Sequence, residues 1–148
     1  MTEQEPSRTR IKVRHYELDT LGHVNQAVYH QYAEVARLDL FHRAGGHDEM
    51  RKGGIAPVLL ESHIRYRREL RDGDEVDVTC HATFGDGKVF WMANEIIRTD
   101  GTLSAEISCT LGLMDLGARK LVPAPRDRMA EAGVDLDVLC GPTAPVSG

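Results

Sequence analysis

A short segment near the N-terminus combines the residue types that acyl-transfer chemistry uses. Asp19, Gly22, His23 and Asn25 lie close together, and Gln26 follows at the predicted start of a helix. An ionised carboxylate can attack a carbonyl carbon or take a proton from water, and an imidazole can exchange protons near neutral pH. The first backbone N–H groups of a helix can hold an oxyanion. The segment therefore predicts a site for attack on an activated carbonyl.

The elements on either side of this segment must position it. Alternation of apolar and polar side chains predicts a first strand over residues 11–16, which ends before Gly22. Apolar positions then recur at helical spacing from about residue 26 to residue 44, and Gly45-Gly46 ends the predicted helix. Because this helix is long and apolar, we expect a curved sheet to wrap around it.

The remainder of the chain is predicted to supply most of that sheet. Period-two patterns and turn residues predict strands over residues 55–68, 76–84, 89–98 and 103–114. Tight turns between them favour an antiparallel meander. A short helix is expected over 126–132, and tails over 1–8 and 133–148 leave one domain over 9–132. The predicted fold class is α+β, an antiparallel five-stranded curved sheet wrapped around one long central helix.

Composition limits the classes of partner. The chain has 148 residues and a formal net charge of −5, which does not favour nucleic acid or an anionic membrane as a partner. No run approaches the roughly 18 apolar residues of a membrane span, and the polar N-terminus does not resemble a signal peptide. Cys80, Cys109 and Cys140 are widely spaced, which favours a cytoplasmic protein with reduced cysteines.

The motif and the order of elements together resemble the hotdog-fold acyl-CoA thioesterases. The residues that carry this resemblance are Asp19, Gly22-His23-Val24-Asn25, Tyr29, Glu34 and Arg37. The chain is similar to the 4-hydroxybenzoyl-CoA thioesterase class and its bacterial long-chain acyl-CoA relatives. The stretches 11–14, 64–68 and 73–74 also fit, so the resemblance covers about residues 9–126. Relatives often carry a second asparagine where this chain has Gln26, which directs attention to the Gln26 backbone.

The resemblance implies roles for the residues of the motif. Asp19 would be the nucleophile or the general base for water, and Glu34 on the helix is the alternative catalytic acid. His23 and Asn25 would orient the acid, the water or the carbonyl, and the Gln26 N–H would hold the oxyanion. Considered without the resemblance, Asp19 and His23 could be turn residues, and Asn25 could simply cap the helix.

Other residues are candidates for substrate binding. Tyr29 is expected to line an acyl channel or to pack in the core. Glu61 interrupts an apolar run, so it lies either at an exposed strand edge or in the site. Arg65, Arg67 and Arg68 form a basic cluster whose guanidinium groups match the phosphates of coenzyme A, although a solvated sheet face explains the cluster almost as well.

The resemblance implies a cytoplasmic enzyme that hydrolyses acyl-CoA thioesters, with active sites between the subunits of a homodimer or homotetramer. No cofactor and no metal ion are expected, because His15, Asp19 and His23 are spaced for metal binding only on a helix, and Gly22 argues against one there. One alternative is an (R)-specific enoyl-CoA hydratase, although its Asn-Pro between Asp and His is missing. The other is a non-catalytic acyl-CoA binding module. The acyl group and its carrier stay open.

Overall fold

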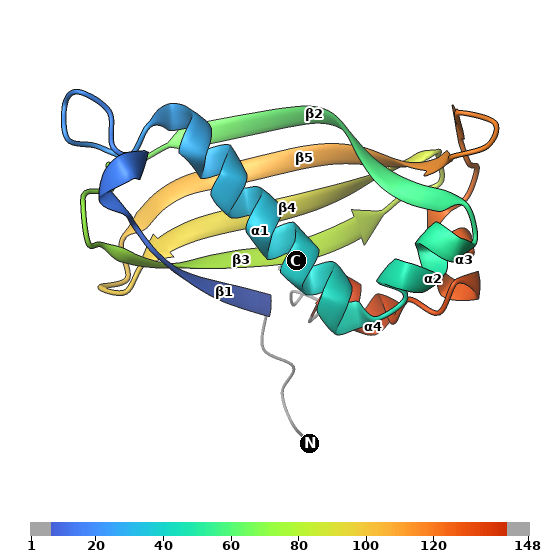
Figure 1. Cartoon of the computed structure of the whole chain (residues 1–148). Helices are drawn as coiled ribbons and strands as arrows, with labels where there is room; N and C mark the ends of the chain where they lie inside the picture. Colours follow the sequence, from blue (N-terminus) through green and yellow to red (C-terminus); the bar gives the residue numbers. More distant parts are fainter. Residues whose placement is uncertain (1–6, 142–148) are drawn as a thin grey trace, which may run out of the picture.

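The computed structural model of the chain describes residues 7–141, and it contains one antiparallel sheet curved around a long helix (Figure 1). The strands are β1 (Ser7–Lys12), β2 (Ile55–Tyr66), β3 (Glu75–Phe84), β4 (Val89–Arg98), β5 (Leu103–Asp115) and β6 (Lys120–Leu121). The helices are η1 (His15–Glu17, a 3₁₀ turn), α1 (Gln26–Ala44), α2 (His47–Lys52), α3 (Pro125–Glu131) and α4 (Leu136–Cys140). The predicted hotdog arrangement is confirmed, with the short β6 as an addition.

The strand order is β1-β3-β4-β5-β2, and β6 pairs with β5. Strands β3, β4 and β5 form the predicted meander. The prediction that β2 belongs to this meander is wrong, because β2 pairs with β5, in a register that places Ile64 opposite Ile107. The connection from β2 to β3 therefore crosses one end of the sheet. That crossing brings residues 67–74 to the loop before α1.

Helix α1 lies along the concave face of the sheet, and its buried residues recur at helical spacing. They are Tyr29, Tyr32, Ala33, Ala36, Leu40, Phe41 and Ala44. Gly45 and Gly46 end the helix with φ angles of 72° and 77°. A Cβ on Gly46 would lie 2.8 Å from the Val134 side chain, so this position needs glycine both for its backbone and for space.

The largest differences from the sequence predictions concern the first strand and the two tails, whereas the other predicted elements agree within two residues at each end. The first strand lies earlier than residues 11–16, because the Glu17 carboxylate accepts a hydrogen bond from the Arg14 N–H at 2.8 Å and turns the chain into η1. The predicted tails are too long: Ser7 already pairs with Cys80, and α4 packs against α1 with Leu139 fully buried. Helix α2 was not predicted. The rest of the predicted tails, residues 1–6 and 142–148, lies outside the described residues.

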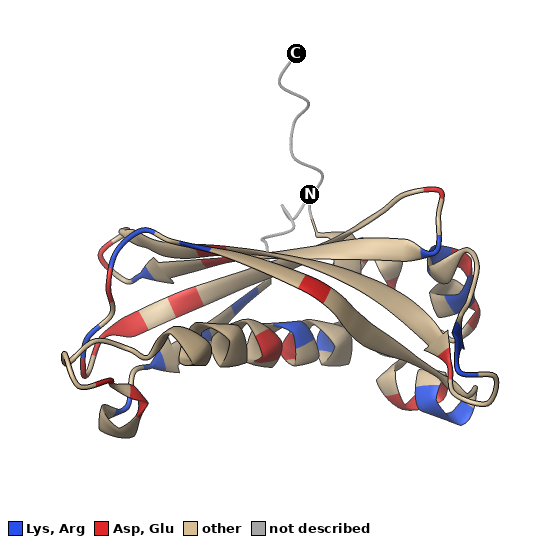
Figure 2. Cartoon of the chain, turned by 90° about the horizontal axis from the view of Figure 1, so that it is seen from above, with Lys and Arg blue, Asp and Glu red and all other residues tan. Residues whose placement is uncertain are grey.

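The core between the sheet and α1 is apolar, and charged residues lie in the connections, along α1 and at single positions on the strands (Figure 2). Cys80 and Cys109 are buried in this core, as the alternation of strand residues predicts. Burial raises the pKa of the Cys80 thiol to about 12, so it stays a neutral core side chain near neutral pH. Between residues 7 and 141, none of the helices combines the length and the apolar character that crossing a membrane requires.

Candidate active site

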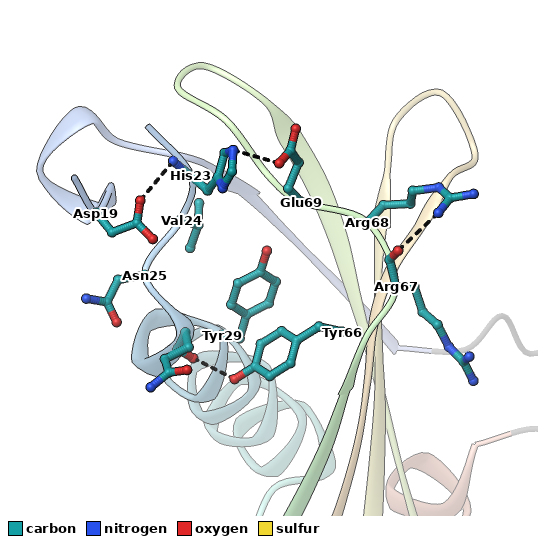
Figure 3. A pocket seen from close by; sticks show the side chains of 10 residues that line it. Asp19, His23, Val24, Asn25, Tyr29, Tyr66, Arg67, Arg68 and Glu69 are labelled. Atoms are coloured by element: carbon teal, nitrogen blue, oxygen red, sulfur yellow. Dashed lines mark hydrogen bonds and ion pairs between the residues drawn. The ribbon is translucent and has the colours of Figure 1, made fainter. Parts of the chain in front are cut away.

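A cavity of about 500 Å³ opens at the N-terminal end of α1, between the loop before the helix and the β2–β3 connection (Figure 3). It brings together most of the residues singled out in the sequence, which are Asp19, His23, Asn25, Gln26, Tyr29, Arg67 and Arg68. Val24, Tyr66 and Glu69 complete the lining. The motif at residues 19–26 and the arginines at 67 and 68 therefore line the same pocket, although they are far apart in the chain.

The loop that carries the motif closes on itself. The Asp19 N–H donates to the His23 carbonyl at 2.7 Å, and the Gly22 N–H donates to the Asp19 carbonyl at 3.1 Å. Gly22 has a φ of 80°, a conformation that glycine adopts without strain. Leu18 and Val24 form a bridge at the base of the loop. The sequence thus builds a tight turn that holds Asp19 and His23 in a fixed relation.

The same loop is held from both sides by backbone hydrogen bonds. The Val24 N–H donates to the Leu70 carbonyl at 2.8 Å, and His23 forms an isolated bridge with Arg71. On the other side, the Asn25 N–H donates to the Glu17 carbonyl at 2.9 Å. The loop is therefore fixed to the β2–β3 connection and to η1 at the point where α1 begins.

The Asp19 carboxylate is exposed and oriented by its own loop. Its Oδ1 accepts hydrogen bonds from the Leu21 N–H at 2.9 Å and from the His23 N–H at 3.2 Å. Both bonds use one oxygen, so they fix the direction of the carboxylate relative to the turn. A carboxylate presented in this way at a pocket can act on a substrate carbonyl or on water.

Asn25 caps α1, as one interpretation of the sequence predicts. Its Oδ1 accepts a hydrogen bond from the Ala27 N–H at 2.9 Å. Gln26 is the first residue of the helix, where a backbone N–H has no partner within the helix and the helix dipole is positive. The Gln26 carbonyl accepts a hydrogen bond from the Tyr66 hydroxyl at 3.1 Å, which ties the helix start to the end of β2.

Two tyrosines line the pocket between the start of α1 and the end of β2. Tyr29 and Tyr66 meet edge to face with their ring centroids 5.1 Å apart. Burial raises the pKa of the Tyr29 phenol, so the hydroxyl is neutral near neutral pH. The prediction for Tyr29 left open whether it lines the pocket or packs in the core, and in the structure it does both.

The basic cluster is divided by the structure. Arg67 and Arg68 lie at the rim, and their side chains extend away from Asp19 (Figure 3). Arg67 pairs with Glu106 at 2.8 Å. Arg65 does not line this pocket. It lines a separate hollow, together with His63 and His81. Glu61 is exposed further along β2 and is absent from the lining of the motif pocket.

Glu69 is a site residue that sequence reasoning missed. Its carboxylate lies 2.7 Å from His23 Nε2 and accepts a hydrogen bond from Arg71 Nε at 3.0 Å. The Arg71 hydrogen bond, more than any other contact, holds the pKa of Glu69 below its ordinary value. The only signal in the sequence was its position beside the basic cluster. Nothing local showed that this connection returns to the motif.

Glu17 is a second residue that sequence reasoning missed, and it holds the motif loop in place from the buried side of the loop. It is only 8% exposed, and its Oε1 accepts a hydrogen bond from the Tyr32 hydroxyl at 2.7 Å. Burial, together with this carboxylate, raises the pKa of Tyr32 far above its ordinary value. Because Glu17 also binds the Asn25 N–H through its carbonyl, it connects η1, the loop and α1.

The fold and this pocket define the class of hotdog thioesterases, and comparisons with known proteins agree. A family model described as the thioesterase-like superfamily matches residues 13–132, so the chain belongs to that superfamily. The long-chain acyl-CoA thioesterase FadM of Escherichia coli K12 is 32% identical over 114 residues, which cover 76% of this chain and 86% of FadM.

Solved structures give the same result. The probable thioesterase YbaW from Escherichia coli has a TM-score of 0.78 and 29% identity, and covers 86% of this chain and 98% of its own. A DHNA-CoA thioesterase from Staphylococcus aureus has a TM-score of 0.75 and 25% identity, with 85% and 87% covered. The prediction of a thioester hydrolase is confirmed. Neither the hydratase nor the binding module is favoured by these relatives.

Proposed function

We propose that the chain hydrolyses acyl-CoA thioesters to a free acid and coenzyme A. The observation that carries this proposal is the Asp19 carboxylate, which is held by its own turn at a pocket that Gln26, the first residue of α1, also lines. This arrangement occurs in a chain of the thioesterase-like superfamily, and the relatives named above include thioesterases of CoA esters.

Asp19 acts on the thioester carbonyl by one of two routes. In the first, a carboxylate oxygen bonds to the carbonyl carbon, the C–S bond breaks with the electron pair on sulfur, and water hydrolyses the resulting anhydride. In the second, Asp19 takes a proton from water while the water oxygen bonds to the carbonyl carbon. Both routes consume one water and release acid and thiol, and both need an ionised carboxylate.

The start of α1 stabilises the charge that develops on the carbonyl oxygen. The Gln26 N–H supplies the hydrogen bond, and the helix dipole adds a favourable field. Asn25 accepts a hydrogen bond from the N–H of the following helix residue, Ala27, and so contributes by fixing the start of the helix that carries the Gln26 N–H. His23 lies on the adjacent wall and handles the proton or orients the water.

Two groups of residues are proposed to bind the two parts of the substrate, the acyl group and coenzyme A. Tyr29 and Tyr66 provide an aromatic surface for the acyl group next to the thioester. Arg67 and Arg68 at the rim suit the phosphates of coenzyme A. Arg65 and Glu61, proposed from the sequence as further contacts, lie outside the pocket of one protomer and are not needed for this arrangement.

A homodimer or homotetramer, placed in the cytoplasm, completes the proposal. Asp19 and Gln26 are exposed in one chain, whereas electrostatic stabilisation works best where water is excluded. Strand β2 is an edge of the sheet, and its Leu59 and Leu60 are 49% and 50% exposed. An unpaired apolar edge favours pairing with a second chain. Sedimentation analysis tests this assembly.

The function is tested by thiol release, followed with a thiol-reactive dye, from acyl-CoAs ranging from acetyl-CoA to palmitoyl-CoA and including benzoyl-CoA. We expect wild type to turn over at least one of them and Asp19→Asn to turn over none at a comparable rate. Wild-type protein that binds these compounds without releasing thiol would contradict the proposal and favour the binding module.

A further inference from the structure

Glu69 faces the motif pocket from the β2–β3 connection and contacts the one imidazole of the motif. Its Oε2 lies 2.7 Å from His23 Nε2, and its Oε1 accepts a hydrogen bond from Arg71 Nε at 3.0 Å. The carboxylate therefore lies between an imidazole and a guanidinium, and each of its oxygens has one partner. Figure 3 shows His23 directed toward Glu69 across the upper wall of the pocket.

The backbone holds this contact in register. His23 bridges Arg71, and the Val24 N–H donates to the Leu70 carbonyl at 2.8 Å. Two consecutive residues of the connection, 70 and 71, are thus joined through the backbone to two consecutive residues of the motif loop. The Glu69–His23 side-chain contact lies directly beside this backbone pairing, which distinguishes it from an ion pair between two mobile surface side chains.

The chemistry of the two groups determines where the imidazole proton lies. A neutral imidazole has one N–H donor and one acceptor nitrogen, and an ionised carboxylate only accepts. Arg71 holds the pKa of Glu69 below its ordinary value, so this carboxylate is ionised near neutral pH. A proton on Nε2 makes the 2.7 Å contact a hydrogen bond, and it leaves Nδ1 as the acceptor.

We propose that Glu69 is a positioning residue that fixes the His23 ring with its proton on Nε2, so that Nδ1 accepts a hydrogen bond from the attacking water. This inference rests on the proposed thioesterase function and narrows the role of His23 within it. His23 receives a proton or orients water through Nδ1, and in its neutral form it does not donate to the thioester carbonyl through that atom. The oxyanion is then left to the Gln26 N–H.

Two variants of Glu69 and one matched control test the proposal. Glu69→Ala removes the acceptor, and Glu69→Gln keeps an oxygen that can accept the Nε2–H bond. Glu131→Ala is the control, because Glu131 also pairs with an arginine, Arg128 at 3.0 Å, but lies on α3 away from the pocket. Thiol release is measured on the acyl-CoA that wild type turns over fastest in the panel above.

We expect Glu69→Ala to lower kcat roughly tenfold, a small part of the effect of a general acid–base group, with KM within about twofold of wild type. Glu69→Gln should recover part of this loss, and Glu131→Ala should match wild type. The second measurement is the ¹⁵N chemical shift of the His23 ring nitrogens at alkaline pH. It should show the proton on Nε2 in wild type and a mixture of tautomers in Glu69→Ala.

The ring measurement is independent of turnover, so the two proposals fail in different ways. Absence of thiol release by wild type would overturn the thioesterase function, whereas the ¹⁵N shifts would still report the tautomer. An unchanged tautomer or an unchanged kcat in Glu69→Ala would overturn the positioning role. Because the Glu69 side chain is 42% exposed, folding should survive the substitution, and thermal melting of all three variants checks this.

Discussion

Two carboxylates, separated by one residue in the chain, have opposite environments. Glu17 is buried beneath the motif loop, and its carboxylate accepts a hydrogen bond from the Tyr32 hydroxyl at 2.7 Å. Asp19 is exposed at the pocket, and its carboxylate accepts hydrogen bonds only from N–H groups of its own turn among the described residues. One carboxylate joins the loop to α1, and the other is presented to solvent.

Under the proposed function, this difference in environment separates a residue that stabilises the site, Glu17, from a residue proposed to act on substrate, Asp19. A buried carboxylate with a fixed partner stabilises one conformation, and removing either partner leaves a polar group unsatisfied. An exposed carboxylate that is oriented by backbone N–H groups contributes less to the fold and stays accessible to substrate. We therefore expect substitutions at Glu17 to reduce stability first and substitutions at Asp19 to reduce turnover first.

The largest effect is expected for Asp19→Asn. The asparagine oxygen can still accept the N–H groups of Leu21 and His23, so the turn should persist while the charge is lost. We expect kcat to fall by about 10²–10⁴-fold, with little change in melting temperature. Thiol-release kinetics and thermal unfolding of the same samples check this.

Asp100→Asn is the matched control for that substitution. Asp100 also accepts a backbone N–H in a turn, from Thr102 at 2.9 Å, but it lies between β4 and β5. It should retain wild-type turnover. Comparable activity in Asp19→Asn and Asp100→Asn would reduce Asp19 to a turn residue and remove the distinction between the two carboxylates.

Glu17→Ala should produce the largest loss of stability. The Tyr32 hydroxyl and the Arg14 N–H would lose their shared acceptor, at a cost of about 3 kcal/mol in the free energy of unfolding. Glu17→Gln keeps an acceptor and should cost less. Urea denaturation of Glu17→Ala, Tyr32→Phe and the double variant measures the coupling, and we expect the double variant to lose less than the sum. Additive losses would show that the pair is not a unit.

Local patterns in the sequence were sufficient for most elements of the fold. Residues 89–98, which follow the predicted hairpin turn at 85–87, form β4 with the predicted bounds, and α1 begins and ends where Asn25 and Gly45 predict. Period-two and helical patterns can be detected within a short stretch of sequence, because they arise from residues close together in the chain that share one face of an element. The partner of β2 depends instead on contacts across the chain, so the turns alone favoured the wrong neighbour.

The same distinction explains the site. Asp19 and His23 could be predicted because their chemistry and turn lie within one short motif. Glu69 could not, because its contact with His23 requires the β2–β3 connection to return to that motif. Glu17 could not either, because an isolated glutamate near a strand end is usually exposed, and its burial depends on the partner Tyr32, which lies further along the chain.

A smaller loss of stability is expected at the other end of α1. This end lies away from the pocket, so the comparison of Glu17 with Asp19 predicts no loss of turnover there. Gly46→Ala would place a Cβ 2.8 Å from the Val134 side chain and 2.9 Å from its backbone nitrogen, at a φ of 77°. We expect a loss of about 2 kcal/mol in urea denaturation. Gly101→Ala, which has a positive φ but open space around its Cβ, isolates the backbone part and should cost less. Equal losses would show that contact with Val134 does not matter.

The smallest effect is expected at a third kind of carboxylate, which neither builds the site nor faces substrate. Asp77 on β3 accepts a hydrogen bond from Arg10 Nε at 2.6 Å, and this bond holds the pKa of Asp77 below its ordinary value. A group whose pKa is lower in the folded state stabilises the fold above its unfolded pKa, near 4 for aspartate, and loses this contribution as the pH falls through the folded value.

The urea midpoint of wild type should therefore decrease on acidification below about pH 4, and Asp77→Asn should flatten part of that decrease. The effect is small because Arg10 is largely exposed and solvent screens the pair, so added salt should weaken it further. Asp86→Asn removes a hairpin carboxylate that forms no ion pair within residues 7–141, and it should leave the slope unchanged. If Asp77→Asn instead lowered turnover as strongly as Asp19→Asn, the proposed separation between carboxylates that stabilise the fold and the one that acts on substrate would fail.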